Sequence, residues 1–259
     1  MNIVSKLNKK VSLAVLSCIG ALVMSDLSIA QSNSWSLSRD MMTSISTNPT
    51  TPTPPATGVW GFMENLTTNS IPFSSSSYTF LDSYSQPCFS NVYYPVTPST
   101  LNCWQHNPGE EGSFNTVGIS TSATVNVGRF FGSFDVIQGM PFLIPTDPNG
   151  FPGGVGQVIV SWKSPIAGKV RILGRVADLD HGCGDGIQWR ILKGNTPGNS
   201  ANLVSVTTSW SPVFNNASPF YIASVPVLVG TQIYFVVDAG AAGTAGCDAT
   251  SFDVLIDKL

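Results

Sequence analysis

Apolar and polar residues alternate along several short segments in the second half of the chain. Apolar or small side chains occupy every second position at Val158–Trp162, Val170–Val176, Ile187–Ile191, Val225–Val229, Ile233–Val237 and Phe252–Ile256. Successive side chains of a strand point to opposite faces, so this period indicates strands with one buried face. Turn signals such as Asp147–Gly150 separate the segments. The pattern predicts an all-β fold, an antiparallel β-sandwich or barrel.

The part of the chain before residue 117 alternates less and is richer in Ser, Thr and Pro. Short strands are predicted at 59–63, 78–81 and 92–94, with long loops between them. One helical turn over 38–42 is suggested, and no longer helical period appears. Residues 48–58 are rich in Thr and Pro, which favours an extended surface segment. We therefore expect an extended segment over 31–58 that packs on or leads into one sandwich domain over 59–259.

The first 30 residues have the pattern of a secretory signal peptide. Three lysines precede Val11–Val23, an apolar run of 13 residues that is too short for a permanent membrane span. Small residues at Ser28–Ala30 favour cleavage after Ala30. The alternative is acylation of Cys18, because the three residues before it loosely resemble a lipoprotein box. Export to the periplasm or the extracellular space is predicted, and no second apolar segment is long enough to be transmembrane.

The net charge of the chain limits the kinds of partner that it can bind. Without residues 1–30 the chain has 229 residues, with nine basic and 14 acidic ones, so its net charge is −5. This acidic balance argues against nucleic acid as a partner. Charged residues make up only 10% of the full chain, and hydroxyl and amide side chains carry the surface instead. Such a composition suits a secreted β protein with a single domain.

Four cysteines remain after the predicted signal peptide: Cys88, Cys103, Cys183 and Cys247. An even number in an exported chain predicts disulfides, and four cysteines allow three pairings. Cys88 and Cys103 lie in one aromatic, Pro-rich stretch, and the other two lie in similar Gly/Asp stretches. The pairs Cys88–Cys103 and Cys183–Cys247 are therefore favoured. A cysteine metal site is the alternative, but C-x2-C and histidine spacings are missing.

Several short motifs together resemble a known class of secreted domain. They are Trp35–Ser38, Asn48–Pro49, Gly58–Trp60, Val160–Gly168, Gly174–Asp180, Gly184–Ile187, Ile233–Gly240 and Asp248–Asp253. These stretches resemble a β-sandwich domain of exported bacterial proteins, some of which carry a PEP-CTERM sorting tail. The resemblance implies a jelly-roll-like sandwich similar to carbohydrate-binding modules, and it implies no catalytic activity. This chain departs from the pattern at Ile144–Gly150, where a Leu-His-Pro-Gly type segment is usual, and it lacks the tail.

Acidic loops form the first candidate site. Its members are Asp178, Asp180, Asp185, Asp238 and Asp248. The predicted Cys183–Cys247 bridge would gather these loops at one end of the sandwich. Hard cations such as Ca²⁺ take six to eight oxygen ligands from carboxylates and loop carbonyls, so a calcium ion is a candidate cofactor. The alternative is that these carboxylates only cap turns by accepting backbone N–H bonds.

Loop aromatics form the second candidate site. Tyr93, Tyr94, Trp104 and Trp210 fall in stretches without clean alternation. Exposed rings of this kind stack on sugar rings, which gives affinity at low entropic cost. The alternative is that they cover the ends of the core. Trp162 and Trp189 alternate with polar neighbours and are predicted core residues.

Basic residues cluster in one part of the chain. Six of the nine that follow the signal peptide lie within 163–193. On neighbouring strands several of them would share an outer face, which could meet anionic glycans or a membrane surface. The alternative is an ordinary solvated face, where lysine also discourages edge-to-edge strand pairing.

No catalytic signature emerges. The chain has two histidines, His106 and His181, and lacks the G-x-S-x-G and H-E-x-x-H motifs. Glu110 and Glu111 are adjacent, so their side chains point apart and cannot act as a glycosidase pair.

These features together favour a non-catalytic, exported binding module. Carbohydrate is the preferred ligand, and the loops around Tyr93, Trp104 and 178–185 are the predicted site. One alternative is a secreted protein-interaction or host-interaction factor that binds a surface protein. A second alternative is a hydrolase whose site the sequence does not reveal.

Overall fold

The computed structural model describes the chain in segments. These are residues 33–49, 58–65, 78–81, 83–88, 99–105, 115–129, 132–145, 156–180, 187–194, 201–208, 218–239 and 247–259. Residues 33–259 form one compact unit, and the description below concerns this unit alone. Among the segments described, no helix is both long and apolar enough to cross a membrane.

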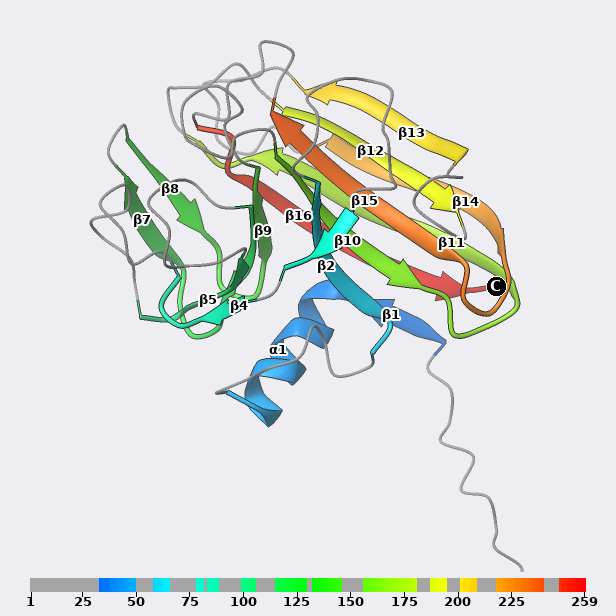
Figure 1. Cartoon of the computed structure of the whole chain (residues 1–259), viewed down its shortest axis with the longest axis horizontal. Helices are drawn as coiled ribbons and strands as arrows, with labels where there is room; N and C mark the ends of the chain where they lie inside the picture. Colours follow the sequence, from blue (N-terminus) through cyan, green and yellow to red (C-terminus); the bar gives the residue numbers. More distant parts are fainter. Residues whose placement is uncertain are drawn as a thin grey trace, which may run out of the picture. The chain divides into compact units, whose positions relative to one another are not determined.

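The unit contains two large antiparallel sheets and a separate two-stranded sheet of β7 (Val125–Arg129) and β8 (Gly132–Val136) (Figure 1). The larger contains, in spatial order, β14 (Ser218–Val227), β11 (Gly168–Asp178), β16 (Thr250–Lys258), β9 (Pro141–Ile144), β6 (Thr116–Ser120), β5 (Leu101–Gln105) and β4 (Ser83–Ser85), with β1 (Ser34–Ser36) also paired to β16. The smaller contains β13 (Ala201–Thr208), β12 (Ile187–Gly194), β15 (Gln232–Ala239), β10 (Gln157–Lys163), β2 (Trp60–Asn65) and β3 (Tyr78–Phe80). The expected all-β antiparallel sandwich is confirmed.

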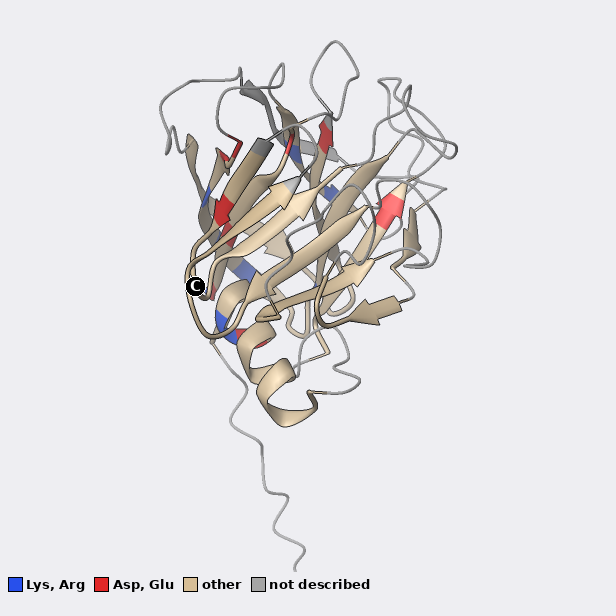
Figure 2. Cartoon of the chain, turned by 90° about the vertical axis from the view of Figure 1, so that its left-hand side faces the viewer, with Lys and Arg blue, Asp and Glu red and all other residues tan. Residues whose placement is uncertain are grey.

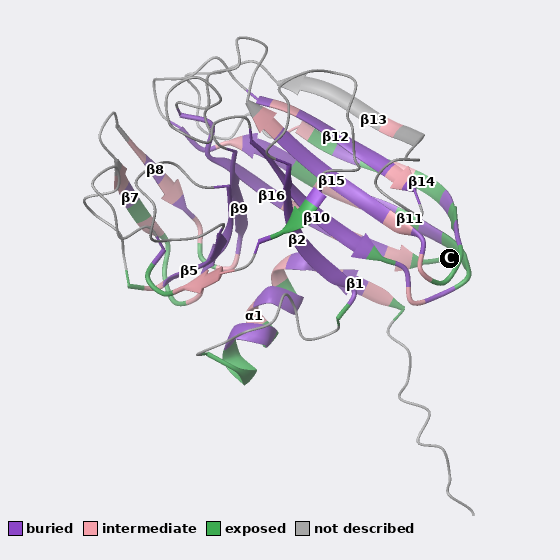
Figure 3. Cartoon of the chain, in the orientation of Figure 1, coloured by how far each residue is buried: buried purple, intermediate pink, exposed green. Residues whose placement is uncertain are grey.

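The main core lies between the two sheets, where the strands are coloured as buried in Figure 3. Trp162 and Trp189 are 0% and 2% exposed, so the prediction that they are core residues is confirmed. The Trp35 and Trp162 rings lie 5.2 Å apart, which attaches β1 to the centre of the core. The alternation in the sequence gives the expected result in β10, β11, β12, β15 and β16, where one face is apolar and lies in this core.

The N-terminal segment differs from the prediction. Residues 34–47 are not extended throughout, because β1 is followed by an 11-residue helix, α1 (Leu37–Thr47). The Ser36 side chain caps the helix by accepting a bond from the Arg39 backbone N–H. Leu37, Met41 and Ile45 recur at intervals of four and are buried on the same side of the helix. The single turn expected over 38–42 was therefore too short, because frequent Ser and Thr hid this stripe.

A second, smaller core lies beside the larger sheet. The hairpin of β7 (Val125–Arg129) and β8 (Gly132–Val136) contributes Val127 and Phe134 to it. The Cys88–Cys103 disulfide lies in the same cluster with a Cα–Cα distance of 5.3 Å, so this predicted pairing is confirmed. Cys247 is also disulfide-bonded. Cys183 lies outside the described residues, so the Cys183–Cys247 pairing stays a prediction.

Candidate functional site

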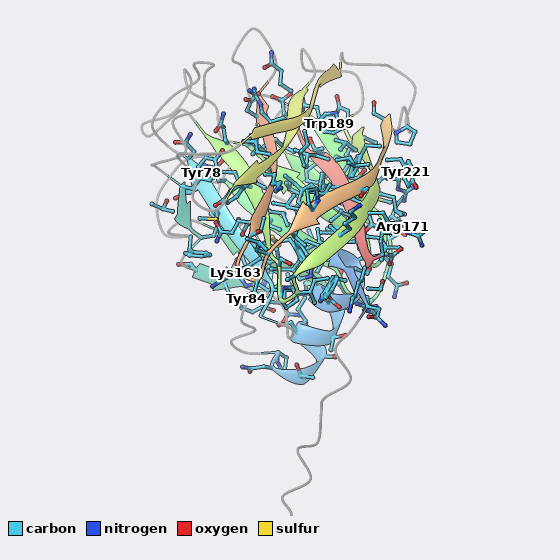
Figure 4. The ribbon with its side chains drawn as sticks, turned by 90° about the vertical axis from the view of Figure 1, so that its right-hand side faces the viewer. Tyr78, Tyr84, Lys163, Arg171, Trp189 and Tyr221 are labelled. Atoms are coloured by element: carbon cyan, nitrogen blue, oxygen red, sulfur yellow. A yellow bond between two sulfur atoms is a disulfide. The ribbon has the colours of Figure 1, made fainter. Side chains whose placement is uncertain are left out.

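The outer face of the larger sheet presents a row of side chains across four strands. On β11, Leu173 lies opposite Tyr221 of β14 and opposite Leu255 of β16. Leu255 in turn lies opposite Ser36 of β1. Directly opposed residues of antiparallel strands share a face, so the four side chains form one line across the sheet. Tyr221 is 65% exposed, and Figure 4 shows it at the outer side of the molecule.

A second row runs parallel to the first. Arg175 of β11 lies opposite Pro219 of β14 and opposite Asp253 of β16. Between the two rows the surface is hollowed by a depression of about 550 Å³. Its lining includes Ser36, Leu173, Arg175, Pro219, Asp253 and Leu255. The hollow therefore combines an aliphatic floor with a hydroxyl, a guanidinium and a carboxylate.

Gly174 makes the strand beneath the hollow possible. Its missing side chain would point into the core, where the Phe220 ring occupies the space. A Cβ atom at this position would lie 2.5 Å from Phe220 Cζ and 2.2 Å from the Asp253 carbonyl oxygen. Both distances are shorter than ordinary van der Waals contacts, so a larger residue would displace β11 or β16. The glycine thus keeps Leu173 and Arg175 on a regular strand.

The charged groups at the hollow have unused hydrogen-bonding capacity. The Arg175 guanidinium has Met140 Sδ as its contact, at 3.9 Å. The Asp253 carboxylate makes neither a hydrogen bond nor an ion pair with any described residue. Four residues earlier on β11, Arg171 is instead bonded to Asp257 at 2.9 Å. Arg175 and Asp253 are therefore the members of this face that can bond an added ligand.

The outer face of the smaller sheet carries the same kinds of residue in a different state. Asn65, Gln157 and Asp238 lie side by side on β2, β10 and β15. The Asn65 amide donates to Gln157 Oε1 at 2.9 Å, and the Gln157 amide donates to Asp238 Oδ2 at 3.2 Å. Arg190 of β12 also donates to Asp238 Oδ2, at 3.4 Å. This chain of bonds crosses four strands and is largely buried.

Aromatic rings flank this buried polar row. Tyr78 lies opposite Asn65 and meets Tyr234 edge-on with ring centroids 5.4 Å apart. The Tyr234 hydroxyl is hydrogen-bonded to Gln232 Oε1. Both rings are buried, and Figure 4 shows Tyr78 on the side of the molecule away from Tyr221. The row and its rings therefore resemble an interior more than a surface.

Desolvation dominates the electrostatics of this row. Burial raises the pKa of Asp238 to about 6, although Arg190 and the Gln157 amide both favour the charged carboxylate. Both donors reach Oδ2, while Oδ1 is buried without a hydrogen-bond partner in the described segments. Burial also raises the pKa of Tyr234 to about 12 and lowers the pKa of Arg190, an effect that Asp238 opposes. The Arg190–Asp238 pair is thus desolvated and incompletely bonded.

The predicted loop aromatics do not form the expected platform within the described residues. Trp104 is 2% exposed and packs in the core against Phe62 and Tyr84, with centroids 4.8 and 5.4 Å away. The prediction that Trp104 is an exposed sugar platform is wrong, because its side chain points from β5 into the main core. Tyr93, Tyr94 and Trp210 lie outside the described residues.

The predicted acidic site is only partly assembled. Asp178, Asp180 and Asp248 lie at one end of the larger sheet, whereas Asp238 belongs to the buried row of the other sheet. Asp178 Oδ1 accepts from the Asp180 N–H at 2.9 Å. Asp180 Oδ2 accepts from the Ala249 N–H at 2.7 Å. These bonds match the turn-capping alternative.

Metal binding is not resolved by these contacts. Within the described segments, no group of three or more His, Cys, Asp or Glu residues is placed to hold a metal ion. Asp185 lies outside those segments. A calcium site completed there therefore stays a prediction.

Sequence reasoning missed the hollow and the exposed ring of Tyr221, which lies opposite Leu173 of its lining. Phe220 and Tyr221 are adjacent aromatics, and alternation alone cannot tell which of them faces the core. The structure buries Phe220 and exposes Tyr221. The expected sharing of one outer face by basic residues is confirmed on β11, where Lys169, Arg171 and Arg175 are all exposed. Their strand neighbours Asp253 and Asp257 were the missing part of that signal.

No protein-family model matches the chain, and no curated protein matches it significantly. Among solved structures, a cyclase from Fischerella sp. TAU is 12% identical over 65% of this chain and 90% of that chain, with a TM-score of 0.33. A family 35 carbohydrate-binding module from Clostridium thermocellum is 13% identical over 62% of this chain and 89% of that chain, with a TM-score of 0.28. An Arthrobacter globiformis T6 isomalto-dextranase is 13% identical over 62% of this chain and 24% of that chain, with a TM-score of 0.31. With TM-scores this low, neither fold nor function is transferred to this chain.

Proposed function

We propose that this chain is a non-catalytic module that binds a neutral saccharide in the hollow on the outer face of the larger sheet. One observation carries the proposal. An exposed aromatic ring, Tyr221, lies one row from a guanidinium and a carboxylate that have no ion-pair partner in the described segments, Arg175 and Asp253. Ring, cation and carboxylate are the groups that sugar recognition uses.

The apolar part of the hollow suits the C–H face of a sugar ring. Leu173 and Leu255 form an aliphatic strip that continues to Tyr221 across β14. Aromatic and aliphatic surfaces of this kind bury the flat, less polar side of a pyranose. The strip lies on hydrogen-bonded strands, so little conformational entropy is lost when a ligand binds.

The polar part of the hollow favours a neutral ligand over a charged one. Vicinal hydroxyls can donate to the Asp253 carboxylate and accept from the Arg175 guanidinium at the same time. An anionic ligand would be repelled by Asp253, and a cationic one by Arg175. A neutral diol therefore uses both groups without leaving a charge uncompensated.

The test uses a shortened chain that begins at Gln31. This chain contains the whole compact unit and lacks the predicted signal peptide. A glycan array identifies the ligand, and titration calorimetry measures its affinity. The Tyr221→Ala variant should lose about tenfold in affinity, because one stacking surface is removed. Phe80→Ala is the matched control. Phe80 is 62% exposed on the other sheet, so its removal should leave affinity unchanged.

Two results would overturn the proposal. Equal affinity losses in Tyr221→Ala and Phe80→Ala would show that the hollow is not the site. Absence of any bound glycan, together with a protein recovered by pull-down, would favour the protein-interaction alternative. Release of reducing ends from a bound glycan would instead favour the hydrolase alternative.

A further inference from the structure

Lysines are confined to one end of the sandwich. Beyond residue 10 the chain contains four of them: Lys163, Lys169, Lys193 and Lys258. Lys163 is the last residue of β10, Lys169 is the second residue of β11, and Lys258 is the last residue of β16. Val170, next to Lys169, lies opposite Lys258, and Lys193 lies opposite Ile233 near the start of β15. Figure 1 shows β10 and β16 ending on the side where the C-terminus lies.

An exposed aliphatic turn lies at the same end. Leu228 and Val229 are 67% and 70% exposed, and they form the turn between β14 and β15. The turn is closed by a bond from the Thr231 N–H to the Leu228 carbonyl at 2.9 Å. Gly230, with φ of 85°, occupies the position that requires positive φ. The two aliphatic side chains are therefore held outward by a defined turn.

Hydrogen bonds join this turn to the lysine-bearing segments. The Gly230 N–H donates to the Ser164 carbonyl at 2.8 Å, directly after Lys163. The Leu259 N–H donates to the Lys169 carbonyl at 3.0 Å, and Leu259 is itself 57% exposed. We call this surface the basic end and define it by the four lysines with Leu228, Val229 and Leu259. Its apolar and cationic groups therefore lie at the same end of the sandwich, on strands of both sheets.

The charges of the basic end are available to a partner. None of the four lysines forms an ion pair with a described residue. Arg171 and Asp257 nearby neutralise each other at 2.9 Å. The end keeps a positive net charge even when the α-carboxylate of Leu259 is counted. At the opposite end lie Asp178, Asp180 and Asp248, and acidic residues are visible at the top of Figure 2.

We infer that the basic end docks on an anionic phospholipid surface. Lysine ammonium groups attract anionic headgroups, and aliphatic side chains enter the headgroup boundary. A soluble polyanion would use the lysines but not the exposed Leu228 and Val229. An acidic protein surface would lack the aliphatic environment that these two side chains need. Docking by this end leaves the side of the sandwich, with the hollow and Tyr221, open to other ligands.

The experiment measures co-sedimentation of the protein with lipid vesicles, again with the chain that begins at Gln31. Vesicles of phosphatidylcholine alone are compared with vesicles containing about one-third phosphatidylglycerol. Binding should require phosphatidylglycerol and should fall as salt rises. The triple variant Lys163→Gln, Lys169→Gln, Lys258→Gln should bind about 100-fold more weakly, since each lysine contributes about fivefold. The matched triple Lys→Arg variant keeps the charges and should bind as the unchanged chain does.

Apolar insertion is tested separately. The pair Leu228→Ser and Val229→Ser should weaken vesicle binding by about tenfold or more. Phe80→Ser, on the outer face of the smaller sheet, is the control and should have no effect. Binding that is indifferent to phosphatidylglycerol or to the lysines overturns the inference. Binding that needs the lysines, ignores Leu228 and Val229, and is abolished by soluble heparin assigns the end to a polyanion and also overturns it.

Discussion

The two outer faces of the sandwich contain the same kinds of residue in opposite states. The larger sheet presents Arg175 and Asp253 in the lining of the hollow and the exposed Tyr221 in the neighbouring row. The smaller sheet presents Tyr78, Arg190 and Asp238, which lie close together and are largely buried. On the first face the cation and the carboxylate have no ion-pair partner in the described segments, and on the second they bond each other at 3.4 Å.

This difference teaches that residue type does not decide which face binds. A buried guanidinium that is already bonded to a carboxylate affects the folding stability of its own sheet and has few donors left for a ligand. An exposed guanidinium with no ion pair keeps most of its N–H donors for a ligand. The smaller sheet is therefore expected to respond in stability measurements, and the larger sheet in affinity measurements.

The largest effect should come from breaking the buried pair. Arg190→Met leaves the Asp238 carboxylate buried without its cation, so the free energy of unfolding should fall by about 3 kcal/mol. Arg175→Met on the open face is the matched variant and should change stability by less than about 0.5 kcal/mol. Urea denaturation measures both. Equal losses in the two variants would contradict the contrast between the faces.

The buried carboxylate should also make stability depend on pH. Its pKa is raised to about 6 in the folded chain, against roughly 3.9 in the unfolded chain, so the folded state binds more protons between these values. Unfolding free energy should therefore rise by up to roughly 3 kcal/mol as pH falls from about 7 to about 4. This contribution is complete below the unfolded pKa and is lost as pH rises through the folded pKa.

Denaturation curves across this range measure the slope. Asp238→Asn should remove the part of the slope that this carboxyl causes, whatever its effect on absolute stability. Asp253→Asn, on the exposed face, is the control and should leave the slope intact. A slope that survives Asp238→Asn would assign the pH dependence to another group.

A smaller effect is expected for ligand affinity on the open face. Asp253→Asn and Arg175→Gln should each weaken saccharide binding by roughly tenfold, the loss of one charge-assisted hydrogen bond. Arg171→Gln removes a cation from the same strand that is already bonded to Asp257, so its affinity should be unchanged. Titration calorimetry with the sugar identified on the glycan array measures the affinity of each variant. A loss in Arg171→Gln as large as in Arg175→Gln would point to general charge rather than to the hollow.

The smallest effect is expected from metal removal. Asp178 and Asp180 already accept backbone N–H bonds, so EDTA should leave the melting midpoint unchanged. A clear fall in the midpoint, restored by added Ca²⁺, would show that a calcium site completed by Asp185 exists. Mg²⁺ is the control ion, because it needs a smaller and stricter site.

Much of the fold could be predicted from the local alternation of apolar and polar residues, but the hollow on the larger sheet could not. Val158–Trp162 and Phe252–Ile256 were predicted as strands because one face of each is apolar throughout. The length of helix α1 was underestimated because its buried apolar residues are only Leu37, Met41 and Ile45, among many hydroxyl residues.

The hollow depends on which strands become neighbours. Arg175 and Asp253 are 78 positions apart in the sequence, and only the pairing of β11 with β16 brings them together. The same holds for Arg190 and Asp238, which the pairing of β12 with β15 places diagonally across from each other, two positions out of register. Burial was equally non-local: Trp104 looked like a loop residue, and Tyr221 could not be distinguished from Phe220.

The position of β16 has a consequence for the order of folding. This strand is the last of those described, yet it lies inside the larger sheet between β11 and β9 and also pairs with β1. The Trp35–Ile256 pairing therefore joins residues from the two extremes of the unit. During synthesis the larger sheet cannot close until β16 has emerged, whereas every strand of the smaller sheet precedes β16 and can pair before it, so the larger sheet is expected to be the last to complete its native pairing.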